Sequence, residues 1–188
     1  MKKVLLLVLA IALNSFATYF DYGIGFGTAS THINHNSVEK PCGSNCKNEA
    51  ADINFRIGDK ISDHFIIAAE LAAVGNFYYG DNTYTQFTSF FIGPSLIYYP
   101  IPELQFSGSL GLTSSYNDTD KKYVDLHDDV GVGAALTGAI HIGKERGALL
   151  GIKAYLIKSQ VEYKKDDQKH KDDYKTIGAS FFASFVHL

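Results

Sequence analysis

Apolar and polar residues alternate along most of the chain, from Tyr19 to Phe185. In the segment 104–113, apolar side chains take most even positions, and polar or small side chains take the odd ones. A period of two places the two kinds of residue on opposite faces of a β-strand. The pattern predicts eight strands, at residues 19–30, 51–58, 65–79, 87–99, 104–113, 129–141, 150–156 and 176–185.

The fourth predicted strand lies in a stretch that also has the length of a membrane-spanning helix. Residues 82–102 contain no charged side chain. Three prolines and Gly93 argue against a helix, because proline removes a backbone donor and clashes with the preceding turn. We therefore expect a strand here, with a local bulge at Pro94, since proline cannot donate to a strand ladder.

The connections between the predicted strands alternate in length. Short turns are expected at residues 59–63, 100–103 and 143–147, and longer polar links after the first, third, fifth and seventh strands. This alternation predicts an up-and-down arrangement with all short turns at one end. In lipid an open sheet edge would leave backbone groups without partners, so the last strand should pair with the first.

Alternation alone fits two barrels of opposite orientation, a membrane barrel and a soluble lipocalin-like barrel. The polar face of this chain is rich in Gly, Ser, Ala and Thr, which suits the narrow interior of eight strands. Charges gather in the links, and aromatics gather near the strand ends, as in interfacial girdles. We predict an all-β, eight-stranded antiparallel up-and-down transmembrane β-barrel. The expected lipid-facing residues include Phe106, Leu110, Val132, Ile152 and Phe181. The expected girdle residues are Tyr19, Phe20, Tyr22, Phe77, Tyr78, Tyr98, Tyr99, Tyr116 and Tyr163.

The first 17 residues have the pattern of a secretory signal peptide. Two lysines precede a short apolar run, and Ser15-Phe16-Ala17 forms a small-x-small end. We expect cleavage after Ala17, leaving one domain at residues 18–188. In an exported protein, Cys42 and Cys46 predict a local disulfide. A metal site is the alternative, and it would need further ligands such as the nearby His32 and His35; we expect no metal and no cofactor.

The end of the chain carries a sequence pattern known from a family. Thr176-x-Gly178-x-x-Phe181-x-Ala183 resembles the C-terminal β-signal of the small eight-stranded outer-membrane barrels of the OmpA-barrel and OmpX type. The chain departs from that pattern by ending in Val186-His187-Leu188 rather than an aromatic. The resemblance implies an outer-membrane location, recognition by the barrel-assembly machinery, periplasmic termini and long loops outside the cell.

Several charged residues fall on the polar face of the predicted strands. Counting from the turn near Ile61 places Asp52 opposite Glu70, and Lys153 lies on the strand across the ring. Two nearby carboxylates repel each other unless a cation joins them. We therefore predict a lumen plug of Asp52, Glu70, Lys153 and Arg56. A proton or ion path through these and other inward residues (Asp21, Asp129 and His141) is the alternative.

The sequence leaves three classes of function open. The first is a non-enzymatic barrel that anchors itself and displays loops for surface contact or envelope integrity. The second is a lipid A-modifying enzyme of the deacylase type, and the third is a narrow channel for small solutes. The enzyme would draw on Ser30, His32, His35 and Ser37, or on His127, Asp128 and Asp129, with nucleophile and base in hydrogen-bond reach.

Partners follow from composition and from the predicted location. A formal net charge of −3 gives no reason to expect a nucleic-acid partner. We expect a monomer that contacts outer-membrane lipid and lipopolysaccharide. The segment 164–173 mixes Lys and Asp and is interpreted as a solvated loop, with a site for lipopolysaccharide phosphates or divalent ions as the alternative.

Overall fold

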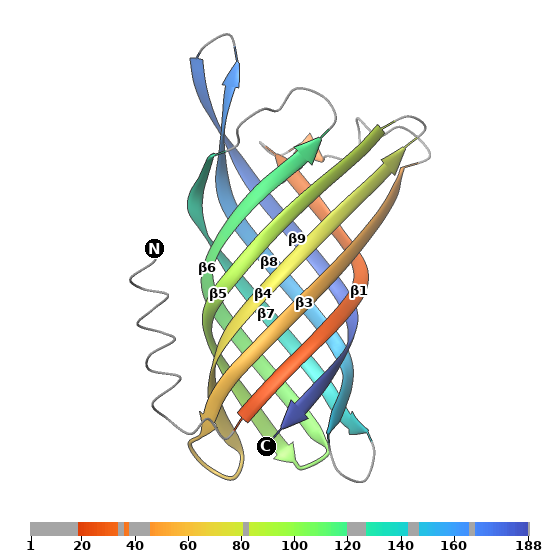
Figure 1. Ribbon diagram of the computed structural model, residues 1–188, viewed down its shortest axis with the longest axis vertical. Helices are drawn as coiled ribbons and strands as arrows, with labels where there is room; N and C mark the ends of the chain where they lie inside the picture. Colours follow the sequence, from red (N-terminus) through yellow and green to blue (C-terminus); the bar gives the residue numbers. More distant parts are fainter. Residues whose placement is uncertain are drawn as a thin grey trace.

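The computed structural model describes residues 19–33, 36–37, 46–80, 83–119, 127–142, 147–165 and 168–187. These residues form a closed antiparallel barrel of eight tilted strands (Figure 1). A two-residue strand, β2, pairs with the last residues of β1, His32 and Ile33. The strands are β1 (Tyr19–Ile33), β2 (Asn36–Ser37), β3 (Lys47–Lys60), β4 (Phe65–Gly80), β5 (Thr83–Ile101), β6 (Leu104–Thr119), β7 (His127–Ile142), β8 (Ala148–Lys165) and β9 (Gln168–His187).

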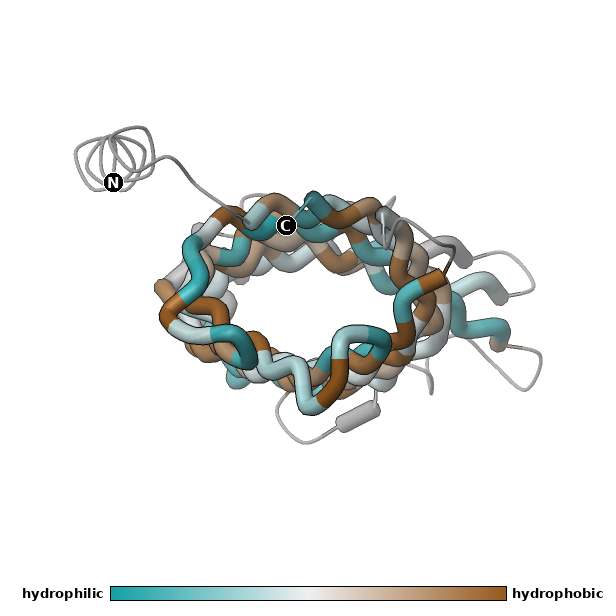
Figure 2. Tube along the Cα trace, turned by 90° about the horizontal axis from the view of Figure 1, so that it is seen from below, coloured by the Kyte–Doolittle hydropathy of each residue, from teal (hydrophilic) through white to brown (hydrophobic). Residues whose placement is uncertain are grey.

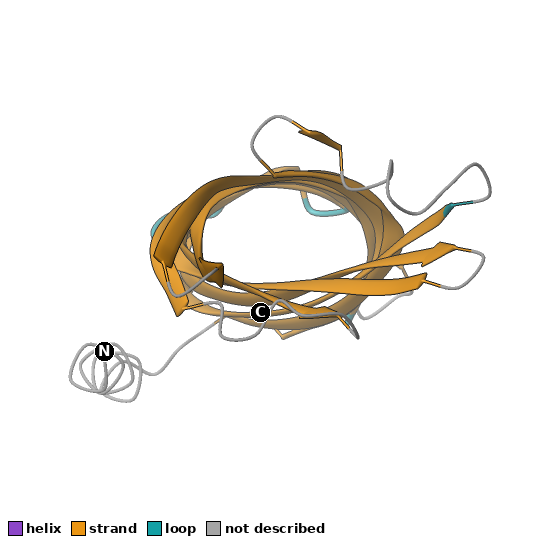
Figure 3. Ribbon diagram, turned by 90° about the horizontal axis from the view of Figure 1, so that it is seen from above, coloured by secondary structure: helices purple, strands orange, loops and turns teal. Residues whose placement is uncertain are grey.

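Each strand of the wall pairs with its neighbours in the chain, and β1 closes the barrel by pairing with β9. The closing ladder runs from Phe20 opposite His187 to Ile33 opposite Tyr174. Seen along the barrel, the strands form an unbroken ring (Figure 3). The predicted fold class and strand closure are therefore confirmed. Within the described ranges, no helix is long and apolar enough to span a membrane.

The two faces of the wall have the predicted orientation. Hydrophobic and hydrophilic residues alternate along the strands (Figure 2). All five residues expected to face lipid are exposed: Phe106, Leu110, Val132, Ile152 and Phe181. The small and polar residues of each strand point into the lumen, where Ser89, Ser95, Ser109 and Ser180 are buried. The apolar outer surface is the arrangement of a barrel in lipid and excludes the lipocalin-like alternative.

The aromatic girdles are partly different from the prediction. Tyr22 stacks on Phe185 on the outer face near the short-turn end, and Phe90 stacks on Tyr116 near the opposite end. Three expected girdle residues instead point inward and are buried: Tyr19, Tyr78 and Tyr99. Each of them occupies an inward position in the alternation of its strand, and strand parity outweighs the interfacial preference of tyrosine.

The strands at the long-loop end are longer than predicted. Strand β4 ends at Gly80 and β5 begins at Thr83, so the expected long link there is a tight connection. The charged segment expected to be a loop instead joins β8 and β9 in a paired hairpin, with Glu162 opposite Lys171 and Lys165 opposite Gln168. This hairpin rises above the rest of the wall (Figure 1). Residues of opposite charge at directly opposed ladder positions, as Glu162 and Lys171 are, favour strand pairing.

The bulge expected at Pro94 is absent. Pro94 lies opposite Ala69, and the ladder between β5 and β6 keeps one register from Ile92 opposite Leu112 to Ser95 opposite Ser109. The register shifts nearer the turn, between Tyr98 and Ile101. Beside the proline, a side chain on Gly93 would meet the carbonyl oxygen of Leu110 and, at 2.5 Å, the Cα of Gly111. Glycine at both positions lets the strands approach there.

A second glycine lies at the barrel closure and yields a testable prediction. A Cβ on Gly27 would meet the backbone carbonyl of Ala179 and, at 2.6 Å, the Cα of Ser180. We expect Gly27→Ala to lower the free energy of unfolding by about 1–3 kcal/mol, because backbone atoms cannot move aside as a side chain can. Gly108→Ala is the matched control, since its nearest neighbour would be Leu136 at an ordinary 3.5 Å. Urea unfolding in detergent micelles measures both, and equal losses would contradict this account of the closure.

Candidate functional site: the lumen polar belt

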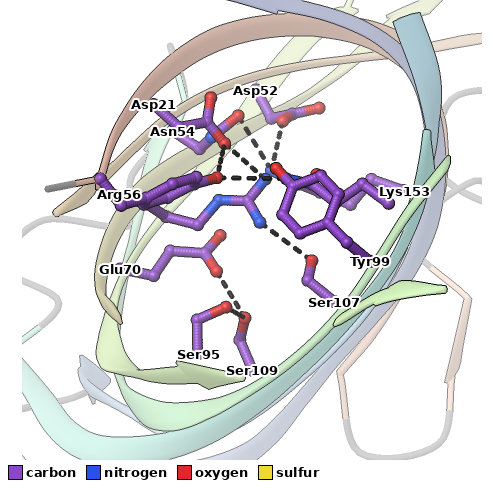
Figure 4. Close-up of polar contacts among 12 residues, drawn as sticks. Asp21, Asp52, Asn54, Arg56, Glu70, Ser95, Tyr99, Ser107, Ser109 and Lys153 are labelled. Atoms are coloured by element: carbon purple, nitrogen blue, oxygen red, sulfur yellow. Dashed lines mark hydrogen bonds and ion pairs between the residues drawn. The ribbon is translucent and has the colours of Figure 1, made fainter. Parts of the chain in front are cut away.

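The candidate site is a set of polar side chains that converge inside the barrel (Figure 4). They come from opposite sides of the wall and are buried. We call them the lumen polar belt: Asp21 on β1, Asp52, Asn54 and Arg56 on β3, Glu70 on β4, Ser95 on β5, Ser107 and Ser109 on β6, Lys153 on β8 and Ser180 on β9. All four residues of the predicted plug lie in this belt.

The first ion pair joins Lys153 to Asp52 across the lumen. The Lys153 ammonium nitrogen lies 2.8 Å from Asp52 Oδ1 and 3.4 Å from Asn54 Oδ1. The Ser180 hydroxyl donates to the other carboxylate oxygen of Asp52 at 2.6 Å. Lys153 and Asp52 are only 2% and 3% exposed. Both oxygens of this buried carboxylate therefore have a donor, which burial of a charge requires.

The second ion pair joins Arg56 to Asp21, a residue that sequence reasoning placed inside but left out of the plug. Arg56 Nη2 lies 3.0 Å from Asp21 Oδ2, and Arg56 Nη1 donates to Ser107 Oγ at 2.9 Å. The Tyr19 hydroxyl donates to the same Asp21 oxygen at 3.0 Å. Both charged side chains have no solvent exposure. Asp21 lies directly opposite Arg56 in the ladder of β1 and β3, so strand parity placed it inside and the register of these two strands makes it the partner of Arg56.

Glu70 differs from the prediction. The ladder places Arg56, and not Asp52, directly opposite Glu70, while Asp52 lies opposite Val74. The β3–β4 turn is centred at Asp63 rather than Ile61, because Lys60 pairs with Ile66 and the Ser62 hydroxyl accepts bonds from the amides of His64 and Phe65. Glu70 accepts a hydrogen bond from Ser109 at 2.5 Å. Ser109 and Ser95 are also hydrogen-bonded, at 2.9 Å.

Apolar layers lie above and below the belt. The layer at the short-turn end contains Tyr19, Ile66, Ala68, Ile97, Tyr99, Ala139, Leu149, Phe182 and Val186. The layer nearer the long loops contains Ala29, Ala50, Val74, Tyr78, Phe87, Tyr155, Ile157 and Tyr174. The Gln105 side-chain amide links two tyrosines of the layer at the short-turn end, donating hydrogen bonds to the hydroxyls of Tyr99 and Tyr19 at 2.6 and 3.2 Å. Of these residues, Tyr19, Tyr78 and Tyr99 were expected at the membrane surface, so the sequence did not predict the two layers.

The other predicted site residues lie elsewhere. Ser30 and His32 are on β1 at the long-loop end and stay outside the lumen polar belt. Cys42 and His35 fall outside the described residues, so the predicted disulfide between Cys42 and Cys46 stays a prediction. The side chains of Ser37, His127, Asp128 and Asp129 are likewise not among those described, which leaves the enzyme alternative without a geometry. Within the described part of the chain, no three His, Cys, Asp or Glu side chains gather as metal ligands do.

The residues of the suggested β-signal occupy both faces of β9. Thr176 and Gly178 point inward, and Phe181 and Ala183 are exposed. Thr176 is hydrogen-bonded to Thr31 and donates to Tyr174, both at 2.9 Å. The ring of Tyr155 lies directly over Gly178, where a Cβ would collide with it. Gly178 therefore has a packing role in the lumen, and recognition by the assembly machinery stays a prediction.

Comparison with known proteins supports the fold. No family model matches the chain, and no curated protein matches it. Among solved structures, Neisserial surface protein A has a TM-score of 0.53 at 13% identity, covering 90% of this chain and 97% of that one. The outer membrane protein OprG from Pseudomonas aeruginosa has a TM-score of 0.51 at 11% identity, covering 90% and 96%. The chain has the fold of the small outer-membrane β-barrels. At these identities the similarity concerns the fold, and the function must be argued from the lumen and the surface.

Proposed function

We propose that the chain is a non-enzymatic integral outer-membrane β-barrel with a closed lumen, which anchors and displays extracellular loops for surface contact or envelope integrity. The observation that carries the proposal is the lumen polar belt between two apolar layers. Arg56 is the largest of the fully buried side chains, and Lys153 is also among them. Side chains of this size, held by buried ion pairs inside the barrel, support a lumen without a continuous water path.

The same belt argues against an ion or proton path. Each cation is held by a carboxylate on a different strand, and Asn54, Ser107 and Ser180 add hydrogen bonds. Buried ion pairs resist separation because either charge left alone in the interior is strongly destabilising. A conducting path would need these pairs to open repeatedly.

The closed lumen is tested by conductance in planar lipid bilayers and by solute uptake into vesicles. We expect folded wild-type protein to show no single-channel steps and no faster uptake than protein-free vesicles. Folding is verified in the same preparation by the difference in electrophoretic mobility between unheated and heated samples. A steady conductance from folded wild-type protein would overturn the proposal in favour of the channel. Release of fatty acid from lipopolysaccharide by folded protein, above that of heat-unfolded protein, would overturn its non-enzymatic part.

A further inference from the structure

Three basic or titratable residues lie side by side on the outer face of the barrel near the long loops. Lys158 on β8 lies directly opposite Lys175 on β9, and Lys175 lies directly opposite His32 on β1. The two lysines are exposed and His32 is half-buried. We call these three residues the rim cation row. Their juxtaposition across three strands cannot be seen in the sequence, where they lie more than 15 residues apart.

The rim cation row lies at the upper edge of the apolar outer surface. Toward the short turns, the next residues on the outer face are Leu156 on β8 and Ile177 on β9. Ile177 is 48% exposed. Toward the long loops, the next residues on the outer face are Gln160 on β8 and Asp173 on β9, which are hydrogen-bonded to each other at 3.1 Å. The outer wall thus changes from apolar to charged at this level, where a membrane places its headgroups.

The charges in this row favour an anion. Two lysines directly opposite each other repel, and like charges in this position destabilise a sheet. Asp173 is the acidic side chain two residues from Lys175 on the same face, and it also accepts the Gln160 bond. The two lysines together outweigh the single charge of Asp173, so a negatively charged ligand between the lysines would relieve their repulsion.

A hollow of about 520 Å³ lies next to Lys158 on the outer wall. Val130 and Val132 line it on one side and are 63% and 60% exposed, and Lys158, Gln160 and Asp173 line it on the other. It forms where the ladder of β7 and β8 shifts register between Asp129 and Val132. A bulge of this kind breaks the regular wall and commonly accompanies a functional site. The hollow therefore combines an apolar wall with a cation.

We infer that the rim cation row binds the phosphate group of an anionic lipid in the outer leaflet. The two ammonium groups take the phosphate oxygens, and His32 adds an N–H donor. The acyl chains lie along the apolar wall below Leu156 and Ile177, and part of the headgroup occupies the hollow between Val132 and Lys158. This assignment rests on the proposed function, because it requires the barrel to span a membrane with its long loops outside.

The test uses folded, full-length protein in detergent and three probes: lipid A with its phosphates, the same lipid dephosphorylated, and inorganic phosphate. Native mass spectrometry measures the lipid retained by wild type, by Lys158→Gln/Lys175→Gln and by the control Lys47→Gln/Lys60→Gln, which removes two other exposed lysines. We expect wild type and control to prefer the phosphorylated lipid, and the rim variant to bind it on the order of tenfold more weakly.

Two results would overturn the lipid assignment. Equal binding of phosphorylated and dephosphorylated lipid by wild type would show that the rim cation row does not recognise the phosphate group. Inorganic phosphate that binds the row as tightly as the lipid would make it a site for a free anion. Conductance in planar bilayers, measured on the same variants, separates the two proposals. Loss of lipid binding in the rim variant should leave the lumen closed, so the variant should not conduct. Conductance by the wild type would contradict the proposed function whatever the result of lipid binding.

Discussion

Replacing Lys153 with methionine is expected to lower the free energy of unfolding by about 3–5 kcal/mol, because it leaves a carboxylate unpaired in the barrel interior. Asp52 would keep the hydrogen bond from Ser180 but lose the ammonium group 2.8 Å away. Methionine fills much of the same volume without a charge, so the loss reports the electrostatic change more than a cavity. Urea unfolding in detergent micelles or lipid vesicles gives the value.

Two controls isolate the ion pair. Lys47→Met removes an exposed lysine from β3, the strand that carries Asp52, and should change stability by less than about 0.5 kcal/mol. The double variant Asp52→Asn/Lys153→Met removes both charges and should recover a large part of the loss, since the coupled residues are not additive. A loss in Lys153→Met no larger than in Lys47→Met would show that the pair contributes nothing to the fold.

The second large effect concerns the outer face. Leu110 lies in the middle of β6, opposite Ala134, and is 68% exposed. Replacing it with arginine should lower the free energy of folding into lipid by about 2–4 kcal/mol, since a charge at mid-membrane meets hydrocarbon.

Depth supplies the control for that prediction. Ile142 is also exposed, but it ends β7 at the short-turn end, where a charge reaches the interface. Ile142→Arg should therefore cost about 0–1 kcal/mol. Unfolding in lipid vesicles compares the two variants. Equal effects at Leu110 and Ile142 would mean that the wall is not surrounded by a slab of hydrocarbon.

The sequence carried enough information to predict the barrel but too little to predict which residues lie opposite each other on neighbouring strands. Alternation decides which residues face inward, and it placed Asp52, Arg56, Glu70 and Lys153 in the lumen without any structure. Pairing depends on where a turn is centred. A turn centred two residues later moved the partner of Asp52 from Glu70 to Val74.

The ion pair across the lumen depends on a second quantity that a single sequence does not reveal, the shear of the strands around the ring, which sets Lys153 beside Asp52. The pair of Arg56 and Asp21 depends on the register of two neighbouring strands, because these residues are directly opposite in the ladder of β1 and β3. The same limit hid the rim cation row, because His32, Lys158 and Lys175 come together only through the registers of two ladders. Tyr19 and Tyr99 show a different limit, since residue type favoured the membrane surface and strand parity favoured the lumen.

Orientation of the wall is the central claim, and adjacent residues of β9 test it most directly. Phe181 is 74% exposed and Phe182 is 3% exposed. The chain has no tryptophan, so Phe181→Trp and Phe182→Trp each introduce a single fluorophore without background. In vesicles of lipid brominated in mid-chain, we predict strong quenching of the tryptophan at position 181 and weak quenching at 182. Stronger quenching at 182 would mean that the apolar face points inward, which would contradict the membrane barrel.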